Sequence, residues 1–199
     1  MTIKDFNSQF AHPEGWVGRL VGTILAVKNR ERNAWTISML DIQPADQVLE
    51  IGFGPGQAIQ EVAKLVANGF VAGIDLSDVM VEQASKRNRA AIRSGRVLLR
   101  QGSESPLPFE DNKFNKVFAV NSMQYWSNPM EGLQEVRRVL KPGGRVVITI
   151  QPMWAKTEQD VQSASEKLIL QLKQAGFRQV RLETRQIKPV TAVSGIGIK

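Results

Sequence analysis

A glycine-rich segment carries the clearest chemistry in this sequence. The apolar run at residues 48–51 passes into Gly-Phe-Gly-Pro-Gly at residues 52–56 and then into a helical stretch. Glycines at such a turn let the backbone bend sharply and approach a ligand at the carboxyl edge of a sheet. The spacing is not the dinucleotide fingerprint, because Gln57 replaces its third glycine, and no Gly-Lys-Ser/Thr follows to make a Walker loop. The segment predicts a nucleotide-type site of another kind.

An aspartate at the end of the next apolar run extends this prediction. Asp75 lies in Gly-Ile-Asp-Leu-Ser at residues 73–77, 23 residues after Gly52. A carboxylate at the end of a second strand can accept hydrogen bonds from both hydroxyls of a ribose. The alternative is an ordinary aspartate that caps a helix or ends a strand. Because Asp75 is coupled to the glycine segment at this distance, we favour the ribose-binding role.

The elements that must position these residues follow from an alternation of short apolar runs with amphipathic stretches, which predicts an α/β fold with a doubly wound, mostly parallel sheet. Ser77 or Asp78, and Asn128 before Pro129, suit helix N-caps, and Lys-Pro-Gly-Gly at residues 141–144 ends a helix and turns into a strand. The short final connection favours a hairpin, and hence an antiparallel strand near the C-terminus. We expect strands at 47–51, 70–75, 96–100, 116–121, 145–150, 179–184 and 191–198, and helices at about 57–68, 78–93, 129–140 and 157–175.

The composition excludes several classes of site. The chain has 199 residues, of which 42% are hydrophobic and 23% charged, as expected of one globular domain. It contains no cysteine, which excludes disulfides, thiolate ligands and cysteine nucleophiles. With one histidine as well, we expect no metal site. The N-terminal residues show neither a secretory signal nor a membrane span, so we expect a cytoplasmic protein.

Residues 1–43 precede the first strand and are predicted to form two helices. Trp16, Leu20 and Ile24 recur at helical spacing in the first, and Trp35 and Met39 do so in the second. Two interpretations remain open, a helical appendage packed on the sheet and a lid over the nucleotide-type site. We therefore expect an N-terminal helical segment, residues 1–43, and a main domain, residues 44–199, in one compact unit.

Four ordered motifs make the chain resemble a known family: VLEIGFGPG, GIDLSDVMVEQA, SESPLPFEDNKFNKVFAVNSMQYW and LQEVRRVLKPGGRVVITI. From about Pro44 onward it resembles the class I S-adenosylmethionine-dependent methyltransferases, most of all the small-molecule type of ubiquinone and menaquinone biosynthesis. The resemblance implies a Rossmann-like, seven-stranded sheet with its last strand antiparallel. It also implies S-adenosylmethionine as cofactor and S-adenosylhomocysteine as product.

The resemblance assigns cofactor roles to particular positions. The glycine segment and Glu50 match the loop beside the methionine part of the cofactor, and Asp75 matches the ribose-binding acid. Family members usually have an aspartate near the adenine where this chain has Ser103, so Ser103, Glu104 or a backbone carbonyl must make that contact. The implied cofactor-binding residues are Glu50, Gly52, Phe53, Gly54, Gly56, Asp75, Leu76, Met80, Ser103, Glu104, Asn121, Ser122 and Met123.

Methyl transfer of this kind requires few catalytic side chains, because the sulfonium methyl is already activated and the reaction depends on alignment. A general base would help with a weakly acidic acceptor. His12 is one candidate, on a lid, although an exposed loop histidine is the favoured interpretation. Tyr125 is the other candidate. Trp16, Tyr125, Trp126 and Trp154 are the candidates for a substrate pocket, where they stack on a planar acceptor or simply close the core.

A basic stripe holds much of the net charge of +7, with no acid between Glu82 and Glu104. The stripe suits a phosphate backbone or an anionic membrane surface, and a solvated surface is the favoured alternative. Asn-Ser-Met-Gln at residues 121–124 differs from the Asn/Asp-Pro-Pro-Tyr/Phe of methyltransferases that act on exocyclic base nitrogens. A small organic acceptor is therefore our leading hypothesis, with an RNA or protein acceptor, or a non-catalytic cofactor-binding module, left open. The stripe comprises Lys86, Arg87, Arg89, Arg93, Arg96 and Arg100.

Overall fold

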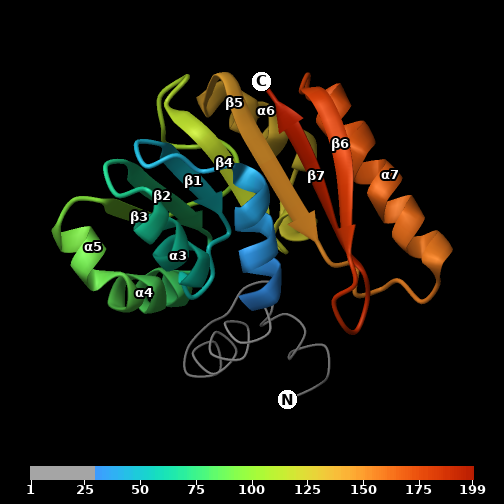
Figure 1. Ribbon diagram of the computed structural model, residues 1–199, viewed down its shortest axis with the longest axis horizontal. Coiled ribbons are helices and arrows are strands. Elements are labelled where there is room, and N and C mark those ends of the chain that lie inside the picture. The colour runs from blue at the N-terminus through green and yellow to red at the C-terminus, as the bar shows by residue number, and fades with distance from the viewer. Residues whose placement is uncertain (1–29) are drawn as a thin grey trace.

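The computed structural model describes residues 30–199, which form one seven-stranded sheet covered by helices (Figure 1). The strand order is β3-β2-β1-β4-β5-β7-β6, and β7 is antiparallel to both of its neighbours. This order confirms the predicted doubly wound sheet and the antiparallel strand near the C-terminus. The strands are β1 Gln47–Ile51, β2 Phe70–Asp75, β3 Val97–Gln101, β4 Phe114–Val120, β5 Leu140–Ile150, β6 Arg178–Arg185 and β7 Ala192–Ile198.

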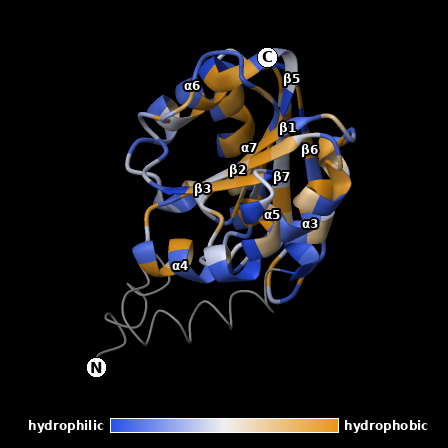
Figure 2. Ribbon diagram, turned by 90° about the vertical axis from the view of Figure 1, so that its left-hand side faces the viewer, coloured by the Kyte–Doolittle hydropathy of each residue, from blue (hydrophilic) through white to orange (hydrophobic). Residues whose placement is uncertain are grey.

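Helices cover the sheet on both faces, so that two hydrophobic cores form. Residues of α6 and α7 pack in one core, and residues of the helical segment 30–40, α3 and α4 pack in the other. Figure 2 shows hydrophobic strands between helices that are hydrophilic on their outer sides. Within residues 30–199, no helix is both long and apolar enough to cross a membrane. The helices are α3 Gln57–Leu65, α4 Asp78–Arg87, α5 Arg89–Arg93, α6 Pro129–Val139 and α7 Glu158–Gln174, with a short turn of 3-10 helix, η1, at Met123–Tyr125.

The helix starts follow the predicted capping chemistry. The Ser77 hydroxyl accepts a hydrogen bond from the Met80 N–H at the start of α4. Asn128 Oδ1 accepts from the N–H groups of Met130 and Glu131, with Pro129 in the first helical position. These side chains satisfy N–H groups that the first turn of a helix leaves without partners. The starts of α4 and α6, next to the two loops most relevant to the site, are therefore fixed by local sequence.

Some predicted boundaries were wrong. The helix expected at 78–93 breaks at Asn88, and α3 ends at Leu65 instead of residue 68. β4 begins two residues early, and β5 begins at Leu140 instead of residue 145, because Leu140 pairs with Phe114 before a bulge shifts the register. The predicted turn at residues 141–144 is thus part of an irregular strand. Residue 121, expected to end β4, lies beyond it.

The helical segment 30–40 is docked on the sheet, which confirms the second predicted N-terminal helix. Ile37 and Leu40 are buried in the core below it. The Thr36 hydroxyl lies 2.7 Å from Thr149 Oγ1 on β5, which lies 2.5 Å from Ser194 Oγ on β7. These contacts hold the segment over the centre of the sheet (Figure 1). The first predicted helix, with His12 and Trp16, lies outside the described residues.

Candidate active site

A cavity of about 1340 Å³ opens at the carboxyl ends of the parallel strands. The turns after β1, β2, β3, β4 and β5 form its floor, residues 30–34 of the helical segment form one wall, and the β6–β7 loop forms another. Parallel strands end at one edge of a sheet, so the sequence brings its chemistry to this edge. The predicted residues that line the cavity are Glu50, Gly52, Phe53, Gly54, Asp75, Leu76, Met80, Ser103, Glu104, Asn121, Ser122, Tyr125 and Trp126.

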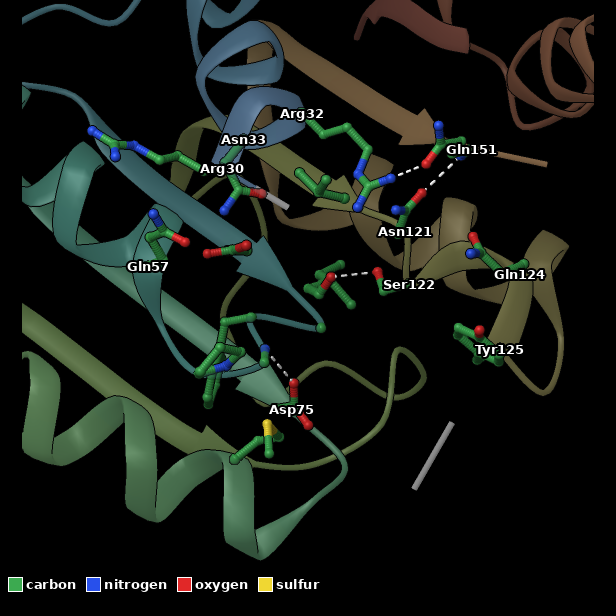
Figure 3. A pocket seen from close by; sticks show the side chains of 18 of the residues that line it. Arg30, Arg32, Asn33, Gln57, Asp75, Asn121, Ser122, Gln124, Tyr125 and Gln151 are labelled. Carbon is green, nitrogen blue, oxygen red and sulfur yellow. Dashed lines mark hydrogen bonds between the residues drawn. The ribbon is translucent and has the colours of Figure 1, made fainter. Parts of the chain in front are cut away.

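Gly52 lies where two strand ends come into close contact. Its φ is 77°, in the left-handed region that favours glycine. A Cβ built on Gly52 would lie 2.3 Å from Cβ of Ser122, which follows β4. The Ser122 hydroxyl donates a hydrogen bond of 2.6 Å to the Ile51 carbonyl (Figure 3). The glycine therefore lets the turns after β1 and β4 pack together at the floor of the cavity.

Gly56 acts away from the cavity, where it joins the glycine segment to α4. A Cβ on Gly56 would lie 2.5 Å from Cβ of Ala84. Asn88, which is 3% exposed, donates through Nδ2 to the carbonyls of Gly56 and Ala84, at 3.0 and 2.9 Å. Asn88 supports the glycine segment from outside and also breaks the predicted helix. This role of Asn88 was not predicted from the sequence, although an asparagine inside a predicted helix was an available signal.

Asp75 is fixed by backbone N–H groups on both of its carboxylate oxygens. Oδ2 accepts from the Gly54 N–H at 2.7 Å, and Oδ1 accepts from the Ser77 N–H at 3.0 Å. The side chain lies at the cavity (Figure 3). Asp75 thus joins the glycine segment to the start of α4 and places a carboxylate, which can accept hydrogen bonds from hydroxyl groups, at the cavity.

Glu50 places a buried acid under the cavity. It is 2% exposed, and its Oε2 has no hydrogen-bond partner among the described residues. Burial raises the pKa of Glu50 well above its usual range, and the charges of Asp75 and Glu61 raise it further, against a hydrogen bond from the Ile59 N–H. A buried carboxyl oxygen without a protein partner can accept a hydrogen bond from a ligand's ammonium group. The site therefore fits the ammonium group of S-adenosylmethionine.

The turn after β3 brings Ser103 and Glu104 to the cavity, and both also hold the local backbone. The Ser103 hydroxyl donates to the Ser105 carbonyl at 2.7 Å. Glu104 Oε1 accepts from the N–H groups of Ser127 and Asn128, at 2.7 and 3.3 Å. Ser103 Oγ therefore keeps its lone pairs for a ligand, whereas one Glu104 oxygen is already occupied by the loop before α6.

On the other side of the cavity, polar side chains gather over the ends of β4 and β5. Asn121 has a φ of 52°, and its Oδ1 accepts from the Gln151 N–H at 2.7 Å. Arg32 Nη1 donates to Gln151 Oε1 (Figure 3). Asn121 was predicted from the sequence, whereas Arg32, Asn33 and Gln151, which line the same cavity, were not. The cavity thus has two parts: the β1–β2 part, with Glu50 and Asp75, and the β4–β5 part, with Arg32, Asn121 and Gln151.

Several predicted residues do not line the cavity. Met123 is buried in the core beneath it. Trp154, which is 62% exposed, lies outside the lining, and its neighbour Met153 occupies that place instead. The expectations for Met123 as a cofactor contact and for Trp154 in a substrate pocket are corrected accordingly. Tyr125 is half exposed at the rim, and Trp126 is buried against Gly132 with an edge at the cavity.

The basic stripe is partly tied to the backbone of the domain. Arg87 donates to the Pro55 carbonyl at 2.8 Å, Arg96 to the Ala63 carbonyl at 3.0 Å, and Arg100 to the Pro108 carbonyl at 3.3 Å. These three arginines therefore have structural roles in the β3 side of the molecule, away from the β4–β5 part of the cavity.

Within residues 30–199, no cluster of three or more His, Asp or Glu side chains is arranged to hold a metal ion.

Comparison with known proteins gives consistent matches. The family model described as "Methyltransferase domain" matches residues 48–144. The uncharacterized methyltransferase YdaC of Bacillus subtilis (strain 168) is 34% identical over 87% of this chain and 94% of that protein. The demethylmenaquinone methyltransferase of Bacillus cereus (strain B4264) is 30% identical over 85% of this chain and 86% of that protein.

Solved structures show the same fold. The crystal structure of a SAM-dependent methyltransferase from Aquifex aeolicus superposes with a TM-score of 0.70 over 88% of this chain and 96% of that chain, at 19% identity. The similarity confirms the predicted Rossmann-like architecture, including the sheet that positions the cavity.

Proposed function

Because the chain belongs to the class I S-adenosylmethionine-dependent methyltransferases of the ubiquinone and menaquinone type, we propose that it methylates a small organic acceptor. The enzyme class and the cofactor that the sequence implied are confirmed by this membership. The proposal of a small acceptor rests on the volume of the cavity and on its division into the β1–β2 part and the β4–β5 part. A drug-sized ligand needs a pocket of roughly 300 to 1,000 Å³, so the cavity of about 1340 Å³ has room for the cofactor and a second small molecule.

The β1–β2 part is the proposed cofactor site. Asp75 would accept hydrogen bonds from the ribose hydroxyls, and Glu50 Oε2 would accept one from the ammonium group. Gly52 and Gly54 let the backbone come close to the ligand, and both line the cavity. Ser103 Oγ stands near the proposed adenine end as an acceptor. When bound, S-adenosylmethionine supplies a methyl group on a positively charged sulfur.

The β4–β5 part is the proposed acceptor site. Gln151 and Asn121 fix its floor, while Tyr125 and Met153 lie exposed at its rim. These residues orient an acceptor, and alignment of the two reactants can supply ~7 to 11 kcal/mol of rate enhancement at the extreme. Tyr125 is the candidate catalytic residue here, because its hydroxyl can form a hydrogen bond with the acceptor. The apolar rim suits the hydrocarbon body of an acceptor, as the similarity to demethylmenaquinone methyltransferases also supports.

The test is transfer of labelled methyl groups from S-adenosylmethionine into a cell extract, followed by separation of the products by size. We expect label in the small-molecule fraction with the natural protein and almost none with Asp75→Ala. Label in RNA or protein would overturn the proposal in favour of a macromolecular acceptor. Binding of S-adenosylhomocysteine with no label in any fraction would indicate a non-catalytic module.

Glu50 gives cofactor binding a specific pH dependence. The pKa of Glu50 is raised above its ordinary value of 4.5 in the unliganded protein, and an ammonium group against Oε2 lowers that pKa. Binding of S-adenosylhomocysteine therefore releases a proton from Glu50. The release occurs at pH values between the pKa of Glu50 in the complex and its higher pKa in the unliganded protein. Affinity should rise with pH between these two pKa values, by at most about tenfold per pH unit. Calorimetry in buffers of different ionisation enthalpy measures the released proton.

The Glu50→Gln variant should bind S-adenosylhomocysteine more weakly and without this proton release. The variant should also remove a pH dependence of folding, because a raised pKa contributes stability below pH 4.5 that is lost as the pH rises through the raised pKa. Glu110→Gln is the matched control, since Glu110 is exposed on the loop before β4. Equal proton release in the natural protein and in Glu50→Gln would contradict the assignment of the ammonium site.

A further inference from the structure

Arg32 brings a buried positive charge into the acceptor part of the cavity. It comes from the helical segment 30–40, is 7% exposed, and lines the cavity above the ends of β4 and β5. Figure 3 shows its guanidinium beside Gln151 and Asn121, at the opposite end of the cavity from Asp75. Burial lowers the pKa of Arg32, and the charge of Glu31 acts in the other direction. An arginine nevertheless stays protonated in proteins, so the charge persists at this position.

Gln151 holds the guanidinium in one orientation. Gln151 is 1% exposed, and its Nε2 donates to the carbonyls of Ile187 and Val190 at 2.7 and 2.5 Å. Because the amide nitrogen is committed to the β6–β7 loop, Oε1 must face Arg32, from which it accepts a hydrogen bond. The guanidinium has five N–H donors in a planar fork, so a fixed arginine of this kind can also bind a ligand.

The charges around Arg32 favour an anionic ligand. The acids Glu50 and Asp75 lie near or at the carboxyl ends of β1 and β2, and Glu104 lies in the turn after β3. Glu31, the acid on Arg32's own helical segment, lies 3.5 Å from Arg185 in an ion pair. Lys188 of the β6–β7 loop adds a further positive charge to the lining. The cationic lining residues Arg30, Arg32 and Lys188 thus come from the helical segment and the β6–β7 loop, with Glu31 as the acid on that side, whereas the other lining acids come from β1, β2 and the turn after β3.

We propose that the methyl acceptor carries an anionic oxygen group, such as a carboxylate, and that Arg32 binds it. This inference rests on the proposed function, since it names the chemistry of the acceptor at the same site. Arginine and a carboxylate form charge-assisted hydrogen bonds that fix orientation as well as affinity. Arg32 would thereby present the acceptor to the methyl group, with Gln151 as its positioning residue. The amino-acid part of the cofactor also has a carboxylate, which is the other possible ligand of Arg32. The experiment below distinguishes the carboxylate of the acceptor from that of the cofactor.

The experiment measures binding of matched acids and amides to the protein saturated with S-adenosylhomocysteine. The probes are benzoate against benzamide and hexanoate against hexanamide, so that charge changes while shape is kept. We expect each acid to bind about tenfold more tightly than its amide, the effect of one charge-assisted hydrogen bond. Arg32→Gln should abolish this preference, and Arg32→Lys should keep part of it. Equal binding of acid and amide by the natural protein, or binding of neither at tens of millimolar, would overturn the inference.

Arg145→Gln is the control for loosened docking of the helical segment. Arg145 donates to the Met39 carbonyl at 2.9 Å and so also holds the segment 30–40, but it lies outside the cavity lining. This variant should keep the preference for acids. The affinity for S-adenosylhomocysteine should stay within about twofold in Arg32→Gln. A tenfold loss would instead assign Arg32 to the cofactor's own carboxylate and overturn the inference.

The binding measurements also separate this inference from the proposed function. Methyl label in small molecules, with no preference for acids over amides, refutes the anionic acceptor alone. Methyl label in RNA or protein refutes the small-molecule acceptor, and the role of Arg32 falls with it.

Discussion

Asp75→Ala is expected to weaken binding of S-adenosylhomocysteine by about 3 kcal/mol, or roughly a hundredfold. The variant loses the proposed acceptors for two ribose hydroxyls. It also loses the hydrogen bonds that the carboxylate accepts from the N–H groups of Gly54 and Ser77, so the glycine segment and the start of α4 lose a common anchor. Calorimetry gives the affinity, and thermal unfolding of the unliganded protein reports the structural share of the loss.

Asp78→Ala is the matched control for Asp75. Asp78 begins α4, is exposed, and accepts a hydrogen bond from the Val79 N–H, so it shares the local sequence but does not line the cavity. Its replacement should change the affinity by less than about threefold, as for a surface substitution of ~0.5 kcal/mol. Unchanged affinity in Asp75→Ala, or an equal loss in Asp78→Ala, would refute the ribose assignment.

Gly52→Ala is the second variant with a large expected effect. A side chain at a φ of 77° is strained by about 1 to 2 kcal/mol. The added Cβ would also lie 2.3 Å from Cβ of Ser122, and such overpacking costs a further ~1 to 3 kcal/mol. We therefore expect a loss of roughly 2 to 5 kcal/mol in stability, seen as a lower midpoint in denaturant. Binding of S-adenosylhomocysteine should fall with it, because the turns after β1 and β4 must separate at the cavity floor.

Gly95→Ala separates backbone strain from the close contact. Gly95 has a φ of 74° and nothing within 4 Å of the position of an added Cβ, and it lies outside the cavity lining. Gly95→Ala should lose only the stability that the backbone strain costs, and its binding of S-adenosylhomocysteine should be unchanged. The combined variant Gly52→Ala with Ser122→Gly should recover part of the stability lost at Gly52. If Gly52→Ala costs no more stability than Gly95→Ala, the close contact with Ser122 does not constrain the floor.

The fold was predictable because its signals are local. β1 and β2 have the predicted bounds, since their apolar runs end at glycine or aspartate turns. The break at Asn88 was missed because periodicity continues through it, while the break depends on hydrogen bonds to the distant Gly56 carbonyl. The early start of β5 was missed for a similar reason. It depends on pairing of Leu140 with Phe114, which the sequence of the β5 region does not contain.

The two parts of the cavity were not equally predictable. Glu50 and Asp75 stand inside ordered motifs, so their meeting at one edge of the sheet followed from the expected topology. Gln151 directly follows β5 at that same edge, and a polar residue in this place was a usable signal. Arg32 could not be predicted, because its contact with Gln151 spans 119 residues and depends on how the helical segment docks. The acceptor part therefore emerges only from the tertiary structure.

A crystal structure with S-adenosylhomocysteine bound tests most directly the claim that this one cavity holds a cofactor and a small acceptor side by side. We expect the ribose beside Asp75, the amino group beside Glu50 and the sulfur facing the Asn121–Ser122 turn. Open volume should remain between the sulfur and Arg32, enough for a small anionic molecule. A sulfur that faces closed protein, or a cofactor carboxylate that fills the space beside Arg32, would contradict the account.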